Sequence, residues 1–311
     1  MNNKIAIILP AYNEELTIEK TILSFNKYSP NSKIVVVDNN SSDKTYEIAK
    51  ETFEKNQIDG ILLLEKRQGK GNAIRKAFKE IDADIYVMSD ADLTYPANEI
   101  NKIIDPILFE NIDMCVGDRI SKGDYEKENK RFLHNFGNKL VKNLVNKLFK
   151  SDINDIMSGY RAFSKKFVKH YPILVEGFEL ETDMTLHALD KRFNIKEVPI
   201  TYKDRPEGSF SKLNTFNDGF KVLFTIFKIF RYFKPFAFFS LLSSIFVFFS
   251  IISSIPVFDD WFRYKYIFHV PLAILSTGLG LISMILFAVA LILDAISDQN
   301  RREFEQRILK E

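Results

Sequence analysis

The stretch "KIVVVDNNSSDKTYEIAKETFEK", residues 33–55, contains the unit on which the fold depends. An unbroken apolar run, Lys33–Asp38, ends in a carboxylate, and after a polar turn the apolar residues recur at helical spacing. A strand that is apolar on both faces needs cover on both sides, which parallel strands obtain from crossover helices. The stretch therefore predicts a strand followed by a helix over 42–55, with Ser41 or Ser42 as its N-cap.

The same alternation recurs from residue 4 to about residue 202. Predicted strands lie at residues 4–9, 33–38, 60–64, 84–89, 112–117 and 195–200, and helical patterns at residues 14–27, 42–55 and 70–81. Continuously apolar strands that alternate with helices predict an α/β fold with parallel βαβ units. Ligands of such sheets bind beyond the carboxyl ends of the strands. We therefore expect Asp38 and Asp90, which both end strands, at one edge of the sheet.

Composition narrows the class of protein only partly. The 311 residues include 43 Lys+Arg and 41 Asp+Glu, a formal charge of +2, which by itself argues neither for nor against nucleic acid. From the chain as a whole we expect no nucleic-acid partner. The single cysteine, Cys115, excludes an internal disulfide and is predicted to be a core thiol. The first apolar run, Lys4–Leu9, is too short for a signal-peptide core, so we expect nothing to direct the first half of the chain across a membrane.

The last third of the chain has a different character. Residues 235–258 and 267–293 are uncharged runs of roughly 24 and 27 residues, each long enough to cross a hydrocarbon layer of about 30 Å. Lys and Arg flank the pair of runs at positions 221, 228, 231, 234, 301, 302, 307 and 310, against two between them at 263 and 265. The positive-inside rule then predicts a multi-pass membrane protein whose α/β domain and termini are cytoplasmic. A pair of buried core helices is the alternative, but a soluble fold of this size could not surround both runs.

Two further segments have the pattern of helices at a membrane surface. Residues 215–234 are rich in Phe and Ile but carry polar residues at spacings of three or four, which predicts an interfacial amphipathic helix. In residues 131–150 an apolar face opposes lysines, and an ordinary helix packed on the core explains that pattern equally well. The expected domains are thus 1–214, 215–234 and a transmembrane hairpin over 235–311.

Two carboxylates, Asp90 and Asp92, follow the predicted strand 84–89 at a spacing of one residue. Partly buried carboxylates repel each other unless a cation or donor groups offset that repulsion. Hard oxygen ligands suit Mg²⁺ or Mn²⁺, which bridge carboxylates to diphosphate oxygens. The pair therefore indicates a site for Mg²⁺ or Mn²⁺.

Other motifs at predicted strand ends are weaker taken singly. Pro10–Glu14 is explained equally well as a strand-to-helix turn with an Asn cap. Asp38 suits hydrogen bonds from a base or a ribose, although capping of the following helix is the alternative. Gly69–Asn72 is too short for a Walker loop, but it could aim backbone N–H groups at a phosphate.

In their combination and order, these motifs resemble family 2 glycosyltransferases with the nucleotide-sugar-binding GT-A fold. The resemblance rests on Pro10-x-Tyr12-Asn13-Glu14, the Val-Val-Asp38 strand end, Gly69-Lys70-Gly71 and Asp90-x-Asp92. Later segments, at residues 117–119, 155–161, 177–181 and 199–213, are similar to the polyprenyl-phosphate branch, which includes dolichol-phosphate mannose and glucose synthases. The resemblance covers about residues 4–215 and implies a Rossmann-like domain with a mostly parallel sheet, followed by interfacial helices and a two-helix transmembrane hairpin.

The resemblance also implies which residues form the site. Those expected to bind the nucleotide-sugar are Pro10, Tyr12, Glu14, Asp38, Lys70, Asp90, Ala91 and Asp92. Those expected to bind the acceptor lipid phosphate are Arg119, Arg131, Asn135, Ser158, Arg161, Arg205 and Lys212. Asp92 would hold the metal, with Asp90 on the metal or the ribose, and Asp90, Asp92, Arg119 and Arg205 would be the catalytic set. Surface ion pairs are the alternative for the arginines.

Two departures from the pattern leave parts of the site open. Asn39 stands where many relatives have a second Asp, which leaves the base undecided, and Thr94 stands where some have Gln, which leaves the third metal ligand undecided. Glu179 and Glu181 are expected to line the acceptor side as positioning groups rather than as a base, with a capped, solvent-facing helix start as the alternative.

The chemistry of the acceptor suggests a mechanism. An alcohol needs a general base to become nucleophilic, whereas a phosphomonoester with a second pKa of about 6 is already mostly dianionic at neutral pH. Arginines and a divalent cation can bring that dianion to an anionic donor, of the UDP-glucose or GDP-mannose type. We expect direct displacement with inversion at the anomeric carbon.

Two other functions compete with this hypothesis. One is a membrane-attached transferase that acts on a saccharide hydroxyl, or a processive synthase. Processive relatives usually carry a Gln-x-x-Arg-Trp segment, whereas the single tryptophan here, Trp261, lies between the two apolar runs. The other is a nucleotide-binding membrane scaffold without activity, which the retained Asp90 and Asp92 disfavour. Homo-oligomerisation is left open.

Overall fold

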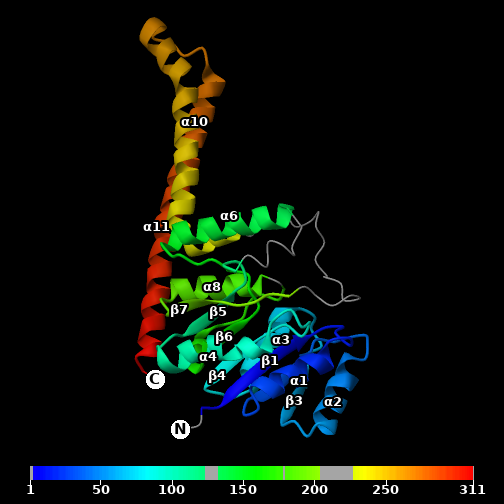
Figure 1. The fold of residues 1–311 in the computed structure, drawn as a ribbon. Coiled ribbons are helices and arrows are strands. Elements are labelled where there is room, and N and C mark those ends of the chain that lie inside the picture. The colour runs from blue at the N-terminus through cyan, green and yellow to red at the C-terminus, as the bar shows by residue number, and fades with distance from the viewer. Residues whose placement is uncertain (1–2, 123–131, 178, 204–226, 311) are drawn as a thin grey trace. The chain divides into compact units, whose positions relative to one another are not determined.

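The computed structural model describes residues 3–122, 132–177, 179–203 and 227–310, and for 132–138 the backbone alone (Figure 1). The chain divides into two compact units, Met1–Phe216 and Asn217–Glu311. The predicted interfacial helix at 215–234 lies largely outside the described residues.

The first unit is built on a seven-stranded sheet in the order β3-β2-β1-β4-β6-β5-β7. Its strands are β1 (Ile5–Ala11), β2 (Lys33–Asp38), β3 (Gly60–Leu64), β4 (Ile85–Met88), β5 (Met114–Asp118), β6 (Arg161–Ser164) and β7 (Ile195–Pro199). Within this sheet β6 runs antiparallel to its neighbours β4 and β5, and the other adjacent pairs are parallel. The predicted α/β fold with a mostly parallel sheet is confirmed.

Helices cover this sheet and close the core (Figure 1). They are α1 (Ile18–Tyr28), α2 (Thr45–Lys55), α3 (Lys70–Glu80), the 3₁₀ turn η1 (Ala97–Glu99), α4 (Ile100–Phe109), α6 (Phe132–Phe149), α7 (Lys165–His170) and α8 (Leu180–Asp190). In one core cluster, Ile22 and Phe25 of α1 join Ile7 of β1, all of them buried. Each such side chain contributes roughly 1.5–3 kcal/mol on burial, which fixes the helices to the sheet. Cys115 is also buried, as predicted, and burial raises the pKa of its thiol to about 12.

Three details of the sequence-based fold were wrong. β6 was missed, because its residues Arg161–Ser164 form no apolar run. The helix expected from residue 14 begins at Ile18. Neither Ser41 nor Ser42 caps α2, which begins at Thr45. The Asp43 carboxylate instead accepts from the backbone N–H of Thr45 at 3.0 Å, while the Ser41 hydroxyl accepts from the Asn13 N–H at 2.9 Å.

The strand order creates a crevice at one edge of the sheet. From β1 the chain moves to β2 and β3 on one side and later returns to β4 on the other side. Ligands of open α/β sheets bind at such a switch point, beyond the carboxyl ends of the strands. Ala11 of β1 is in register with Asp38, and Ile8 with Met88, two residues before Asp90. Asp38 and Asp90 therefore share this edge, as predicted.

The second unit contains two long helices, α10 (Pro235–Tyr264) and α11 (Val270–Ile308), which lie side by side (Figure 1). Both are long and apolar enough to cross a membrane, and only 6% and 11% of their most apolar windows is buried. Core helices of a soluble protein are mostly buried, so this exposure indicates a membrane protein.

Serine hydroxyls join the two helices. Ser243 Oγ donates to the Ser283 carbonyl at 3.0 Å, and Ser283 Oγ returns a bond of 3.0 Å to the Ser243 carbonyl. The helices also extend beyond the predicted apolar runs. The polar stretch 259–264 belongs to α10, and the Asp260 carboxylate accepts from the backbone N–H of Phe268 at 2.8 Å across the short connection to α11.

Candidate active site

A buried ion-pair cluster lies at the switch point. Lys70, the first residue of α3, donates from Nζ to Asp90 Oδ1 and, at 2.6 Å, to Glu181 Oε1 in the first turn of α8. The side chains of Lys70, Asp90 and Glu181 are 12%, 29% and 7% exposed. We call these three residues the Lys70 cluster. Lys70 and Asp90, which we expected to bind the nucleotide-sugar, are thus linked to Glu181, which we expected on the acceptor side.

Glycines permit this close approach. The backbone N–H of Gly71 donates to the Glu176 carbonyl at 3.0 Å, and a Cβ at Gly71 would lie 2.0 Å from the Val175 carbonyl oxygen. A Cβ at Gly159 would lie 2.9 Å from Asp90 Oδ2 and 3.0 Å from Lys70 Nζ. The Gly71 N–H is therefore used within the fold, and the expectation that this turn aims its N–H groups at a phosphate is not supported there.

Electrostatics keep the Lys70 ammonium charged. Burial by itself lowers the pKa of a lysine, because the charged form loses hydration. The negative charges of Asp90 and Glu181 outweigh that effect and hold the pKa of Lys70 above its ordinary value. The cluster is thus a buried cation between two carboxylates at the edge of the crevice.

Asp92 is oriented by the turn that follows it. Its Oδ1 accepts from the backbone N–H of Thr94 at 3.1 Å and from the Thr94 hydroxyl at 2.6 Å. Leu93 between them has a φ of 65°, a left-handed conformation that a branched side chain rarely adopts. Thr94 therefore fixes the direction of the Asp92 carboxylate.

The carboxylates suit a divalent ion that completes its shell elsewhere. Among the residues that the structure describes, no group of three His, Cys, Asp or Glu side chains is placed to hold a metal. Mg²⁺ typically takes one or two carboxylates and fills the remaining positions with water and substrate phosphates. Asp90 and Asp92 fit that donor set, and a third protein ligand is not required.

Asp38, at the end of β2, is the second polar position at this edge. Its side chain is almost fully buried, and Oδ2 accepts from the Ser41 N–H at 3.2 Å. Oδ1 is buried too, and within the described chain it has no hydrogen-bond donor. A buried carboxylate oxygen without a donor is destabilising unless a ligand or water supplies one, so Oδ1 is a candidate ligand contact.

Asn39 is a structural residue. Its amide donates to the carbonyls of Glu65 and Arg67 at 3.2 and 2.7 Å, and its oxygen accepts from the Gly69 N–H at 2.7 Å. Both ends of the amide are thus used to hold the 65–69 loop beside Asp38. Asn39, which left the identity of the base undecided in the sequence, therefore uses its side chain to stabilise the fold.

The other predicted donor residues lie at the same edge but differ in what they contact. Pro10 pairs with Val37 one residue before the end of β1, and the Tyr12 hydroxyl accepts from Gln68 Nε2 at 3.2 Å. The carboxylate of Glu14 accepts from the Thr17 hydroxyl at 3.1 Å, at the start of α1. Ala91 is buried, and its carbonyl accepts from the Thr21 hydroxyl at 3.1 Å.

Arg119 follows β5 and forms a buried ion pair. Its Nε and a terminal nitrogen donate to the two oxygens of Asp155 at 2.7 and 2.9 Å. Burial opposes ionisation of Asp155, but the charge and hydrogen bonds of Arg119 hold the pKa of Asp155 below its usual value. Arg119 also donates to the hydroxyl of Tyr95 at 3.4 Å, and the same hydroxyl accepts from the Gly159 N–H at 2.8 Å. Arg119 thus fixes the segment that places Gly159 against Asp90.

Arg161 is fully buried, and its guanidinium contacts neutral acceptors. It donates to the carbonyls of Ser158 and Ile156 at 2.8 and 2.5 Å and to the Thr185 hydroxyl at 2.8 Å. Ser158 is buried as well. This geometry does not support the acceptor contact expected of Arg161 and Ser158. It assigns them to the support of the 155–161 turn.

The remaining predicted acceptor residues cannot be placed. Arg131, Arg205 and Lys212 lie outside the described residues, and for Asn135 the structure gives its position in α6 and no side chain. Tyr95, Asp155 and Gly159 are site residues that sequence reasoning did not single out individually. Asp155 and Gly159 lie more than 60 residues after Asp90, and the fold brings them close by pairing β6 with β4.

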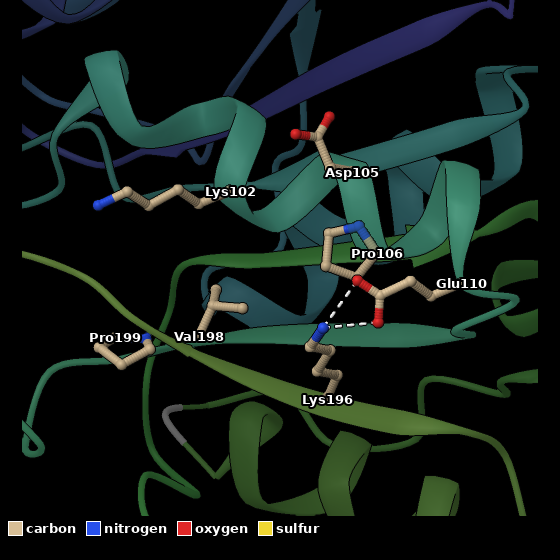
Figure 2. Close-up of a pocket in the computed structure, with 7 residues that line it drawn as sticks. All are labelled: Lys102, Asp105, Pro106, Glu110, Lys196, Val198 and Pro199. Atoms are coloured by element: carbon tan, nitrogen blue, oxygen red, sulfur yellow. Dashed lines mark hydrogen bonds and ion pairs between the residues drawn. The ribbon is translucent and has the colours of Figure 1, made fainter.

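A separate open hollow of about 410 Å³ lies along α4 and β7 (Figure 2). It is lined by Lys102, Asp105, Pro106, Glu110, Lys196, Val198 and Pro199. None of the predicted site residues lines it. Lys196 crosses it to the Glu110 carboxylate, with contacts of 2.7 and 2.5 Å.

Comparison with known proteins gives one matching family. The model of "Glycosyl transferase family 2" matches residues 6–171, which is more than half of the chain. Glycosyltransferase AglJ of Haloferax volcanii is 26% identical over 303 residues, covering 97% of this chain and 96% of the relative. The UDP-N-acetylglucosamine–dolichyl-phosphate N-acetylglucosaminyltransferase of Methanococcus voltae is 30% identical over 214 residues, covering 63% of this chain and 84% of the relative.

Solved structures share the fold. Glucosyl-3-phosphoglycerate synthase of Mycobacterium tuberculosis, in complex with Mn²⁺, UDP and glucosyl-3-phosphoglycerate, superposes with a TM-score of 0.58 at 20% identity. The match covers 72% of this chain and 80% of that structure. The predicted GT-A architecture of the first unit is thereby confirmed.

Proposed function

Because the chain belongs to glycosyl transferase family 2, in the branch of the dolichyl-phosphate transferases, we propose which transfer this glycosyltransferase performs. It moves a hexose from a nucleotide-diphosphate sugar to a polyprenyl or dolichyl phosphate, with inversion. The observation that carries the proposal is the placement of Asp38, Asp90 and Asp92 on one carboxyl edge at the switch point of the sheet.

This placement suits an extended donor. Asp38 ends β2 and Asp90 follows β4, with β1 between them. Neighbouring strands are about 4.8 Å apart, so the two carboxylates stand roughly 10 Å apart across the edge. A nucleoside at Asp38 would place its diphosphate near Asp90 and Asp92, which would hold Mg²⁺ or Mn²⁺. The ion would supply positive charge to the leaving nucleoside diphosphate.

Asp38 also bears on the base. One of its oxygens accepts from Ser41 and the other has no donor among the described residues. A single free acceptor matches the one imide N–H of uracil, whereas guanine presents two neighbouring donors on the corresponding edge. We therefore favour a UDP-sugar over a GDP-sugar, which agrees with the UDP-sugar named for the Methanococcus relative.

The acceptor side favours a phosphate over a hydroxyl. A hydroxyl acceptor would need a general base. Glu181 is bound to Lys70, and the carboxylate of Asp183 accepts from the Tyr171 hydroxyl at 2.7 Å. A phosphomonoester needs no base, because it is already ionised. Cations for it would come from Arg119, together with Arg131, Arg205 and Lys212, which lie outside the described residues.

The two long apolar helices support a reaction at a membrane. We propose that α10 and α11 cross the bilayer with the catalytic unit and both termini on the cytoplasmic side, as the flanking Lys and Arg residues favour. A lipid phosphate would then be presented at the headgroup layer, next to the enzyme's anchor. Serine bonds between α10 and α11 would hold the hairpin together within the apolar layer.

The test is a transfer assay with the full-length protein in detergent. A panel of UDP- and GDP-hexoses is combined with undecaprenyl or dolichyl phosphate and Mn²⁺ or Mg²⁺, and the lipid product is analysed by mass spectrometry. We expect a lipid-linked hexose from at least one pair, lost in Asp92→Ala and retained in Asp105→Asn, a carboxylate change at an exposed position of α4. Full turnover by Asp92→Ala at saturating metal would contradict the assignment of that residue.

Other outcomes identify the competing functions. Sugar transfer to an oligosaccharide without a lipid phosphate would favour the hydroxyl-acceptor transferase. Tight nucleotide binding with no transferred sugar across the whole panel would favour the scaffold. The chemical stability of the product distinguishes transfer to a lipid phosphate from transfer to a hydroxyl, because mild acid cleaves a glycosyl phosphate and leaves a glycosidic bond intact.

A further inference from the structure

The Lys70 cluster has a feature that metal binding alone does not explain. Asp90 is a predicted ligand of the divalent ion, yet its Oδ1 is already bound by the Lys70 ammonium. Its Oδ2 lies against Gly159, where an added Cβ would be only 2.9 Å away. Two cations cannot share Asp90 at hydrogen-bond distance without strong repulsion in a partly buried site.

We propose that Lys70 is a positioning residue that holds Asp90 in the donor-free enzyme and yields it to the divalent ion when a diphosphate arrives. The inference rests on the proposed function, because it concerns the same donor site. It adds an order to that function: the metal alone binds weakly, and the metal and the nucleotide bind cooperatively.

The geometry allows this exchange. Lys70 is the first residue of α3, so its long side chain starts at a helix terminus beside the crevice. Its second partner, Glu181, is only 7% exposed and stays within reach when Asp90 is released. A donor diphosphate would bring new acceptor oxygens for the Lys70 ammonium, while Asp90 would turn to the metal. Lysine suits such a role, because its ammonium is a compact charge on a flexible stem.

A static bridge is the competing explanation. Lys70 joins α3, the end of β4 and α8, and such an ion pair would stabilise the fold without acting on a ligand. In that case removal of its charge would lower stability and leave metal affinity unchanged. The two explanations therefore differ in whether removal of the Lys70 charge changes metal affinity.

The experiment measures Mn²⁺ binding to the full-length protein in detergent, with no lipid acceptor present. Free Mn²⁺ is followed by electron paramagnetic resonance, with and without UDP. We expect Lys70→Met to bind Mn²⁺ alone about tenfold more tightly than the wild type, because a neighbouring positive charge is gone. We also expect weaker UDP binding and the loss of most of the cooperativity between UDP and Mn²⁺, which is reciprocal by linkage.

Matched variants separate this effect from general damage. Lys76→Met is the same change on the same helix, at a lysine paired with Glu80 on the surface at 2.8 Å, and should leave Mn²⁺ affinity unchanged. Lys70→Arg keeps the charge and should keep Mn²⁺ binding weak. Glu181→Gln removes one of the two carboxylates that bind Lys70, so that Lys70 binds Asp90 more strongly. The affinity for Mn²⁺ should therefore fall.

Folded Lys70→Met with wild-type Mn²⁺ affinity would overturn the inference. If Lys70→Met does not fold, Glu181→Gln decides, since tighter Mn²⁺ binding by that variant would contradict the proposal. Wild-type protein that binds Mn²⁺ equally well with and without UDP would also contradict it. The transfer assay is independent: cooperative binding without sugar transfer would refute the proposed function and leave the role of Lys70 intact.

Discussion

Two buried cations, Lys70 and Arg161, flank the turn that carries Gly159, and they have different partners. Lys70 is bound to two carboxylates, those of Asp90 and Glu181. Arg161 is bound to two backbone carbonyls and a hydroxyl, all of them neutral. Lys70 is slightly exposed at the crevice, whereas Arg161 has no exposed surface.

This difference in partners indicates a structural role for Arg161 and a role in ligand binding for Lys70. Backbone carbonyls are fixed by the fold and cannot be exchanged for a ligand, so Arg161 holds the turn permanently. Carboxylates at the rim of a crevice can change partners when a metal or an anion enters. Arg161 therefore builds the wall against which Asp90 is placed, and Lys70 occupies the part of the site that a donor would reorganise.

The largest effect is expected for Asp90→Asn. The variant keeps the shape of the side chain and loses the charge that would face the metal and Lys70, so sugar transfer should fall about 10³-fold. Its melting temperature should change little, because Asp90 lies at the rim. Initial rates with saturating metal and thermal unfolding in detergent measure both quantities. An Asp90→Asn variant with a clearly lower melting temperature but unchanged specific activity would make Asp90 a structural residue, like Arg161.

Arg161→Met should show the opposite behaviour. It removes three hydrogen bonds from buried acceptors, which leaves those acceptors unsatisfied and should destabilise the fold by about 3 kcal/mol. Activity per folded molecule should stay within a few-fold of the wild type. Arg75→Met, an exposed position on α3, is the control for thermal unfolding. A large rise in KM for the lipid phosphate without a loss of stability would restore Arg161 to the acceptor site.

Asp38→Asn tests the nucleoside end of the site. The remaining carbonyl oxygen can still accept from Ser41, while the amide N–H₂ replaces the free acceptor with a donor. UDP affinity should fall about tenfold, the loss of roughly one hydrogen bond to a charged group, and CDP affinity should rise, because N3 of cytosine is an acceptor. Titration calorimetry measures both nucleotides, with Asp59→Asn on the surface as the control. An unchanged UDP to CDP ratio would exclude Asp38 from base recognition.

The smallest effect concerns His187, a third buried titratable group, which faces the rings of Phe167, Tyr171 and Phe193. Burial lowers the pKa of His187 to about 4, whereas an unfolded histidine titrates near 6.5. Below pH 6.5 the unfolded chain binds a proton that the folded chain does not, so stability falls as the pH drops from 6.5 towards 4. At pH 5.5 the loss should be about 1 kcal/mol.

Thermal unfolding at pH 7.5 and 5.5 measures this effect, and His187→Phe should remove that part of the pH dependence. Equal dependence in the variant would show that other groups account for it. Burial among aromatic rings is the main cause of this shift, whereas the pKa of Lys70 is held up by two carboxylates.

Much of the fold followed from local pattern. Strands β2 and β3 and helix α3 were predicted to within a residue, because their apolar spacing is set by which faces must be buried. β6 was missed, because it is a short antiparallel insertion with an Arg at its start. The starts of α1 and α2 were placed four and three residues too early, since the Asn13–Ser41 bond between neighbouring turns replaces a conventional cap.

The candidate site divides in the same way. Apolar runs that end in an acidic residue can be recognised along the chain, and strand polarity puts Asp38 and Asp90 on one edge. Packing of the folded chain sets which charges meet: Lys70 lies between Asp90 and Glu181, Asp155 holds Arg119, and Arg161 is enclosed. The reason is physical, because side-chain period and turn chemistry are local, whereas partners 20 to 111 positions apart are chosen by how helices pack on the sheet.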